Sequence, residues 1–198
     1  MQRTIIFVAL ITLFCMAGCT PADNTNSVST ANSNANNSNR AATAPTATPV
    51  SAPARTDDRA FLTEVAQNGI LEIALGRLAL QKGKGADVKR FAQRVVTDHT
   101  KVGNEVKKIA TAKNITLPTD MTDAQKSTVT RLTALSAAEF DREFMTLMSE
   151  SHDRSVTKFQ EISRNGTDAE IKAFATKTLP TLEEHQKMAH EIHGKLTT

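Results

Sequence analysis

The sequence predicts an all-α protein built as an antiparallel four-helix bundle, with a helical crossover between its two hairpins. Through most of residues 57–198, apolar residues recur every three or four positions, which is the period of a helix that buries one face. Short turns pair four long helical segments into two hairpins, and a longer link joins the hairpins. This connectivity is typical of ferritin-like bundles, and the length fits one domain.

Helix caps and glycines predict the first hairpin. Asp57 and Asp58 can cap a helix over about 57–81, because acidic side chains accept hydrogen bonds from the first turn. Two glycines within 83–85 make a tight turn, and a second helix follows over about 86–113.

The crossover and the third long helix come next. Residues 114–118 contain asparagine and proline and end the second helix, and a weaker helical pattern covers about 120–135. Ser136 is predicted to cap the third long helix, which extends to Arg164. Glu139 occupies the position that completes a capping box.

The last helix starts after a second short turn. Asn165 and Gly166 end the preceding helix, and Thr167 is predicted to cap the last one, with Glu170 three residues on. Pro180 lies inside this helix, where a proline introduces a kink.

Residues 1–19 are predicted to be a lipoprotein signal peptide. The apolar run over 5–14 is too short for a transmembrane helix and matches the apolar core of a secretory signal. The segment 16–19, Met-Ala-Gly-Cys, resembles a bacterial lipobox, which implies cleavage before Cys19 and lipidation of that cysteine. The alternative is an ordinary signal peptide whose removal leaves Cys19 as a free thiol.

The lipoprotein prediction implies an exported protein anchored in the outer membrane and facing the periplasm. Thr20 is not the aspartate that the lipoprotein sorting rule associates with retention in the inner membrane. Removal of the signal lowers the formal charge from +3 to +2, because Arg3 is its only charged residue. The remaining basic residues are spread along every helix, so the sequence does not indicate nucleic-acid binding.

Residues 20–56 are predicted to form a disordered tether that joins the lipid anchor to the bundle domain, 57–198. The segment is rich in Asn, Ser, Thr, Ala and Pro, and Val28 and Val50 are its only large aliphatic residues. Such a composition cannot bury enough apolar surface to offset the entropy of ordering.

One titratable residue occupies the apolar seam of each long helix: Glu72, His99, His152 and His185. Seam positions face the other helices, and a polar group there needs a partner to offset its desolvation. Counting residues from the turns places the first two within about one helical turn of each other. The other two match less closely, by about one further turn.

These four residues form the candidate metal site, because imidazoles with a carboxylate suit zinc, copper or ferrous iron. The candidate accessory residues are Met148, Met188 and His193. A thioether beside an imidazole would favour copper, although methionines also fill gaps in cores, and His193 and His190 fit exposed positions in the last turns. The alternative for the four seam residues is a buried hydrogen-bond network without metal.

Several segments of the domain resemble a known bacterial family. They are Glu72–Gly76, Val88–Ala92, Asp98–His99, Phe140–Phe144, the His152 region, and Leu179–Pro180 followed by His185. The family is catalogued as domain of unknown function 4142 and is often labelled an outer-membrane protein with a ferritin-like fold. The resemblance covers about 57–195 and implies the fold and an envelope location, but no activity.

The residues argue against di-iron and other enzymatic chemistry. Di-iron bundles place a glutamate three residues before a metal-binding histidine. Val96, Ser149 and Leu182 occupy those positions here, and the chain contains no Tyr or Trp. We find no nucleophile motif and no glycine-rich phosphate loop, so we predict no catalytic residues and do not expect an enzyme.

Two functions therefore remain open. The first is a lipid-anchored envelope protein whose bundle binds a metal or small ligand, with stress protection as one role. The alternative is a metal-free helical interaction module that contacts another envelope protein. The membrane is the one partner that the sequence implies, and it leaves open whether the chain binds another protein or itself.

Overall fold

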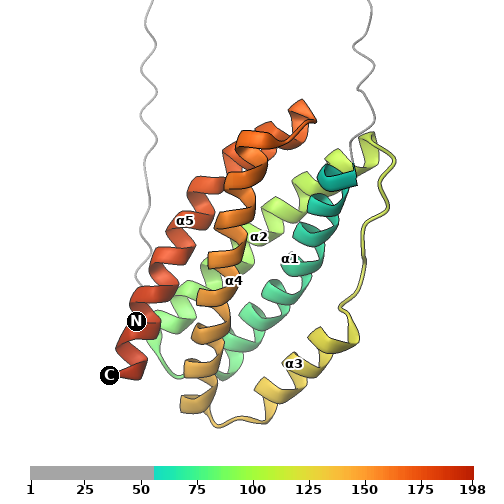
Figure 1. The fold of residues 1–198 in the computed structure, drawn as a ribbon. Coiled ribbons are helices and arrows are strands. Elements are labelled where there is room, and N and C mark those ends of the chain that lie inside the picture. Colours follow the sequence, from blue (N-terminus) through green and yellow to red (C-terminus); the bar gives the residue numbers. More distant parts are fainter. Residues whose placement is uncertain (1–55) are drawn as a thin grey trace, which may run out of the picture. The chain divides into compact units, whose positions relative to one another are not determined.

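The computed structural model describes residues 56–198. Its helices are α1 (Thr56–Lys82), α2 (Ala86–Ala112), α3 (Asp123–Ala134), α4 (Ala137–Asn165) and α5 (Ala169–Thr197). The four long helices form the bundle, and α3 lies in the crossover, where it packs against α1 and α4 (Figure 1). The predicted all-α bundle is thus confirmed. The predicted signal peptide, Cys19 and nearly all of the predicted tether lie outside the described residues.

Two apolar clusters fill the bundle, one toward each end. Phe61, Phe159 and Phe174 belong to the first cluster, in which the ring centroids of Phe61 and Phe159 lie 4.9 Å apart. Phe91 and Phe144 belong to the second, with their centroids 6.2 Å apart. The buried residues between the clusters are polar, and the candidate site lies there. In the described part of the chain, no helix is long and apolar enough to cross a membrane.

Asp141 of α4 holds the tight turn between α1 and α2. Its carboxylate accepts hydrogen bonds from the backbone N–H of Lys84, at 3.1 Å, and of Gly85, at 2.7 Å. A Cβ atom at Gly83 would lie 2.6 Å from the carbonyl oxygen of Ala79. The turn therefore requires glycine at position 83, and a buried carboxylate from the second hairpin fixes it in place.

The predicted cap of α5 is wrong. Asp168, and not Thr167, caps α5, because its carboxylate accepts from the N–H groups of Glu170 and Ile171. The Thr167 hydroxyl instead donates to Asp58, at 2.6 Å. Asp58 lies inside the first turn of α1, and its carboxylate also accepts from the N–H of Asp168. It therefore stabilises the distant turn between α4 and α5 as well as carrying its charge at the start of α1.

A buried ion pair ties the end of α2 to the start of α5. The Lys113 ammonium lies 2.7 Å from the Asp168 carboxylate, and their side chains are 4% and 6% exposed. Lys113 also lies 3.1 Å from the Glu170 carboxylate. Burial of either charge alone would cost desolvation free energy, and the attraction between the two charges offsets this cost.

Candidate metal centre

Three histidines from three helices meet in the polar layer between the apolar clusters. His99 comes from α2, His152 from α4 and His185 from α5. One nitrogen from each ring lies within 4.8 Å of the others, and the ring centroids are 5.4–5.5 Å apart. His152 and His185 are fully buried, and His99 is 7% exposed. The structure thus brings together all three histidines that the seam pattern singled out.

One ring nitrogen of each histidine contacts an acceptor oxygen, which orients the imidazole. Nδ1 of His99 lies 2.8 Å from Oε2 of Glu72, and Nε2 of His185 lies 3.2 Å from Oδ2 of Asp98. Nδ1 of His152 lies 2.8 Å from the carbonyl oxygen of Met148. A carbonyl oxygen can only accept a hydrogen bond, so Nδ1 of His152 carries the proton and its Nε2 keeps a lone pair.

The other nitrogen of each ring has no hydrogen-bond partner within the described residues. These atoms are Nε2 of His99, Nε2 of His152 and Nδ1 of His185, and all three are buried. The histidines therefore share one pattern, in which one nitrogen is occupied by an acceptor and the other is left available. An acceptor on one nitrogen is how proteins set the tautomer and orientation of a metal-binding histidine.

Burial and neighbouring charges set the protonation of the triad. Burial lowers the pKa of His185 to about 4, assisted by the nearby His99 and His152. Burial also lowers the pKa of His152, against the attraction of Glu72. These two rings are therefore neutral at pH 7, the form that binds metals.

Glu72 lies beside the triad, at the outer nitrogen of His99. Burial alone would raise the pKa of its carboxyl, but the adjacent His99 outweighs burial and holds this pKa well below its usual range. Burial also opposes protonation of His99, but the adjacent Glu72 carboxylate outweighs burial and raises the pKa of His99. Ser151 donates to the second carboxylate oxygen of Glu72, at 2.6 Å. Both oxygens are thus engaged, and Glu72 is an ionised partner of His99.

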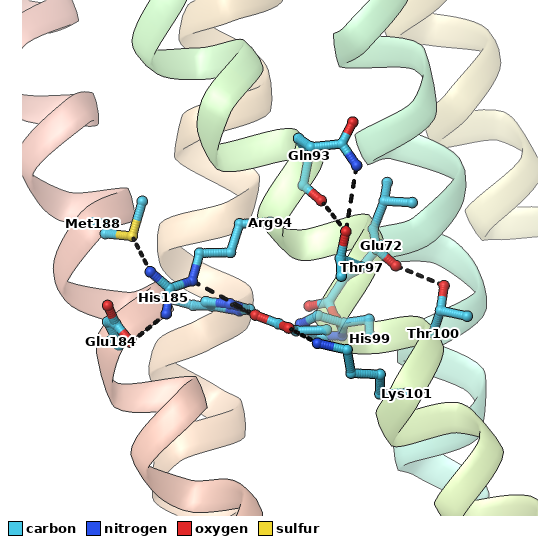
Figure 2. Close-up of polar contacts among 12 residues, drawn as sticks. Glu72, Gln93, Arg94, Thr97, His99, Thr100, Lys101, Glu184, His185 and Met188 are labelled. Carbon is cyan, nitrogen blue, oxygen red and sulfur yellow. Dashed lines mark hydrogen bonds and ion pairs between the residues drawn. The ribbon is translucent and has the colours of Figure 1, made fainter. Parts of the chain in front are cut away.

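Asp98 holds His185 from the neighbouring helix, a role that the seam pattern did not assign to it. Its carboxylate also lies 3.6 Å from Nε of Arg94 and 3.1 Å from Nζ of Lys101. Figure 2 shows Arg94 beside His185, where it also contacts Glu184 of α5. Asp98 precedes His99 by one residue and therefore points about 100° away from it, which turns its carboxylate toward α5.

The candidate accessory residues face other partners. The sulfur of Met188 lies 3.9 Å from Nη1 of Arg94 (Figure 2). Nε2 of His193 lies 3.1 Å from the hydroxyl of Thr146. Met148 is buried in the second apolar cluster and contacts the triad through its backbone carbonyl.

Phe91 and a small cavity complete the surroundings. The Phe91 ring stands edge-on to His152 and His185, with centroids 6.0 and 6.1 Å away. A cavity of about 30 Å³ is lined by Glu72 and His99, among others. This volume is enough for about two water molecules.

Comparison with known proteins identifies the family. Residues 42–192, more than half of the chain, match the model of a domain of unknown function, DUF4142. The chain belongs to this family. The DUF4142 domain is also similar in fold to a crystal structure of a DUF305 fragment from Deinococcus radiodurans. The TM-score is 0.64 at 14% identity, over 73% of this chain and 99% of the other. No curated protein matches the chain.

Proposed function

We propose that the DUF4142 domain binds one transition-metal ion through Nε2 of His99, Nε2 of His152 and Nδ1 of His185. The observation that carries this proposal is the set of three buried ring nitrogens without a partner in the described chain. A buried polar atom left unpaired costs about 1–3 kcal/mol, and native proteins contain few such atoms. Three of them from three helices at one point indicate a shared ligand.

The spacing of the rings supports a single ion. In a tetrahedral zinc site with bonds of about 2.0 Å, neighbouring nitrogens lie about 3.3 Å apart. The triad nitrogens lie within 4.8 Å of one another, so small movements of the rings bring them to that spacing. Zinc, copper and ferrous iron all accept imidazole ligands. The sulfur of Met188 faces Arg94, so this thioether does not favour copper over the other metals.

Glu72 and Asp98 act in this proposal as orienting residues behind the ligands. Each accepts a hydrogen bond from the outer nitrogen of a histidine, which raises the basicity of the inner nitrogen. Their carboxylates also place negative charge next to the cation. This assigns Glu72 a role different from the direct ligand that the seam pattern predicts.

Three protein ligands leave one coordination position for water or a small molecule. The Ser149 hydroxyl is the remaining buried side-chain group without a hydrogen-bond partner in the described chain, and Ser149 lies one helical turn before His152. We propose that this hydroxyl forms a hydrogen bond with the water or small molecule in the fourth position. Together with the proposed lipid anchor at Cys19, this makes the protein a metal-binding domain displayed in the cell envelope.

Elemental analysis tests the proposal directly. The full-length protein, purified without an affinity tag, is offered zinc, copper or iron, desalted and analysed. We expect close to one equivalent of one metal, its loss in His152→Ala, and its retention in His190→Ala. His190 is a matched control because its side chain is 51% exposed and pairs with Asp153, outside the triad. Retention of no metal, or equal retention by both variants, would overturn the proposal and favour a metal-free interaction module.

A further inference from the structure

A groove between α1 and α2 is lined by a second apolar face of α1. Ile70 and Ile73 lie on this face, half-buried, and belong to neither apolar cluster of the bundle. Leu117 and Pro118 of the crossover close one side of the groove, which has a volume of about 190 Å³. Packing of the bundle does not account for these isoleucines.

Two glycines inside the helices keep this groove open. Gly69 of α1 and Gly103 of α2 both line it, and a Cβ atom at either would meet nothing within 4 Å. Gly76 differs, because a Cβ there would lie 2.8 Å from the side chain of Val96. Glycine in a helix interior makes the helix less stable than alanine does. The glycines at positions 69 and 103 therefore lower stability without allowing a closer contact between helices.

The charges around the groove are all positive. Arg77 of α1 and Lys107 of α2 line it, and no aspartate or glutamate does. Within residues 56–198 neither cation forms an ion pair. His99, which is buried and has an unpartnered Nε2, forms part of the wall. An apolar groove that carries two unneutralised cations is complementary to a molecule with an apolar body and a negative group.

We propose that this groove binds a small amphipathic carboxylate. Its apolar body would lie over Gly69 and Gly103 against Ile70 and Ile73, and its carboxylate would pair with Arg77 or Lys107. A cavity of about 150 Å³ is known to hold benzene, so the groove accepts a body the size of an aromatic ring or a short acyl chain. The proposal goes beyond the metal site and does not depend on a bound metal.

Titration of the metal-free, full-length protein with octanoate tests the proposal. Octanol is the control without charge, and acetate is the control without an apolar body. We expect saturable one-to-one binding of octanoate, about two- to fivefold weaker binding of octanol, and no binding of acetate. Equal binding of octanoate and octanol, or no saturable binding of octanoate, would contradict the proposal. Because the metal-free protein is used, failure here leaves the metal site unaffected.

Filling the groove provides the second arm of the test. Gly69→Leu and Gly103→Leu place a side chain where the apolar body would lie, and each should abolish octanoate binding. Gly194→Leu is the matched control, because a Cβ at this helical glycine also meets nothing within 4 Å and Gly194 does not line the groove. It should bind like wild type. All three should melt no lower than wild type, since leucine favours helix, and octanoate binding by either groove variant would contradict the proposal.

Charge and assembly provide the third arm. Octanoate affinity should fall to that of octanol in the double variant Arg77→Gln, Lys107→Gln, and unchanged affinity would contradict the assignment of the carboxylate. Sedimentation distinguishes another occupant of the groove. A wild-type dimer that Gly69→Leu converts to a monomer would show that a second copy covers this face, and would overturn the proposal.

Discussion

The carboxylate of Asp98 on α2 lies 3.2 Å from Nε2 of His185 on α5, behind the ring and away from the centre of the triad. This contact fixes which nitrogen of His185 faces His99 and His152. Its loss should therefore weaken a bound metal without removing a ligand.

We accordingly expect Asp98→Asn to lower metal affinity about 10- to 100-fold while one equivalent still binds at saturation. A competition titration with a chelator measures the affinity. Glu184→Gln is the control, because Glu184 also pairs with Arg94 but does not contact the triad. Equal effects of the two substitutions would indicate that the surface ion pair matters, and not the contact with His185.

His99→Ala should destabilise the protein even when no metal is present. The substitution leaves the buried, ionised Glu72 with Ser151 as its hydrogen-bond partner in the described part of the chain, and removal of one member of a buried pair costs about 3–5 kcal/mol. Urea unfolding of the metal-free protein measures this loss. Adding Glu72→Gln to His99→Ala should restore part of the stability, because a neutral amide is less costly to bury. A double variant that is less stable than His99→Ala would show that Glu72 is not the source of the loss.

The pair of Lys113 and Asp168 should make stability depend on pH under acidic conditions. Burial opposes ionisation of Asp168, but hydrogen bonds from Lys113 and from the first turn of α5 outweigh it and lower its pKa below 3.8. Stabilisation by such a carboxylate is complete above the unfolded-state pKa and is lost as the pH falls through the lower folded-state value.

We therefore expect Asp168→Asn to cost about 2 kcal/mol at pH 7 and progressively less below about pH 4. Urea unfolding of wild type and variant between pH 7 and pH 2 gives the difference at each pH. Because other carboxyls titrate in both proteins, the difference between the two curves is the informative quantity. A difference that is constant down to pH 2 would contradict the assigned shift.

Two glycines of α1 should respond to alanine in opposite directions. Gly69→Ala should stabilise the protein by about 1 kcal/mol, because the new methyl group meets nothing and the helix gains propensity. Gly76→Ala should destabilise it, since the methyl group would lie 2.8 Å from Cγ2 of Val96. Thermal unfolding of both variants measures the effects. Stabilisation of both would show that local propensity outweighs the clash at Gly76, and destabilisation of Gly69→Ala would contradict the open space assigned to position 69.

The seam pattern predicted the helices and the meeting of the histidines well, because both follow from the periodicity of apolar residues. The observed helix bounds fall close to the predicted ones. Counting residues from Gly166 overstates the offset between His152 and His185, because residues 166–168 form the turn and α5 begins at Ala169. The number of residues that a turn occupies depends on its hydrogen bonds, which helical periodicity does not reveal.

Contacts between distant residues were not predicted. Asp58 was assigned to its own helix, yet its carboxylate accepts from Thr167 and Asp168, more than a hundred residues away. The seam pattern assigns Asp98 no role in the site, because it lies off the seam of α2. Helical periodicity predicts the direction of a side chain, but the residue that this side chain contacts on a neighbouring helix depends on how the two helices pack.

The polar layer formed by the histidines divides the apolar interior, and this has a consequence for folding. Every long helix passes through both apolar clusters, but at the level of His99, His152 and His185 the interior offers unpaired nitrogens in place of hydrocarbon. In the metal-free protein, amide hydrogen exchange at this level should therefore be less protected than in the two apolar clusters, with the two ends opening separately. A bound ion would link three helices at one point and merge these openings into a single cooperative transition.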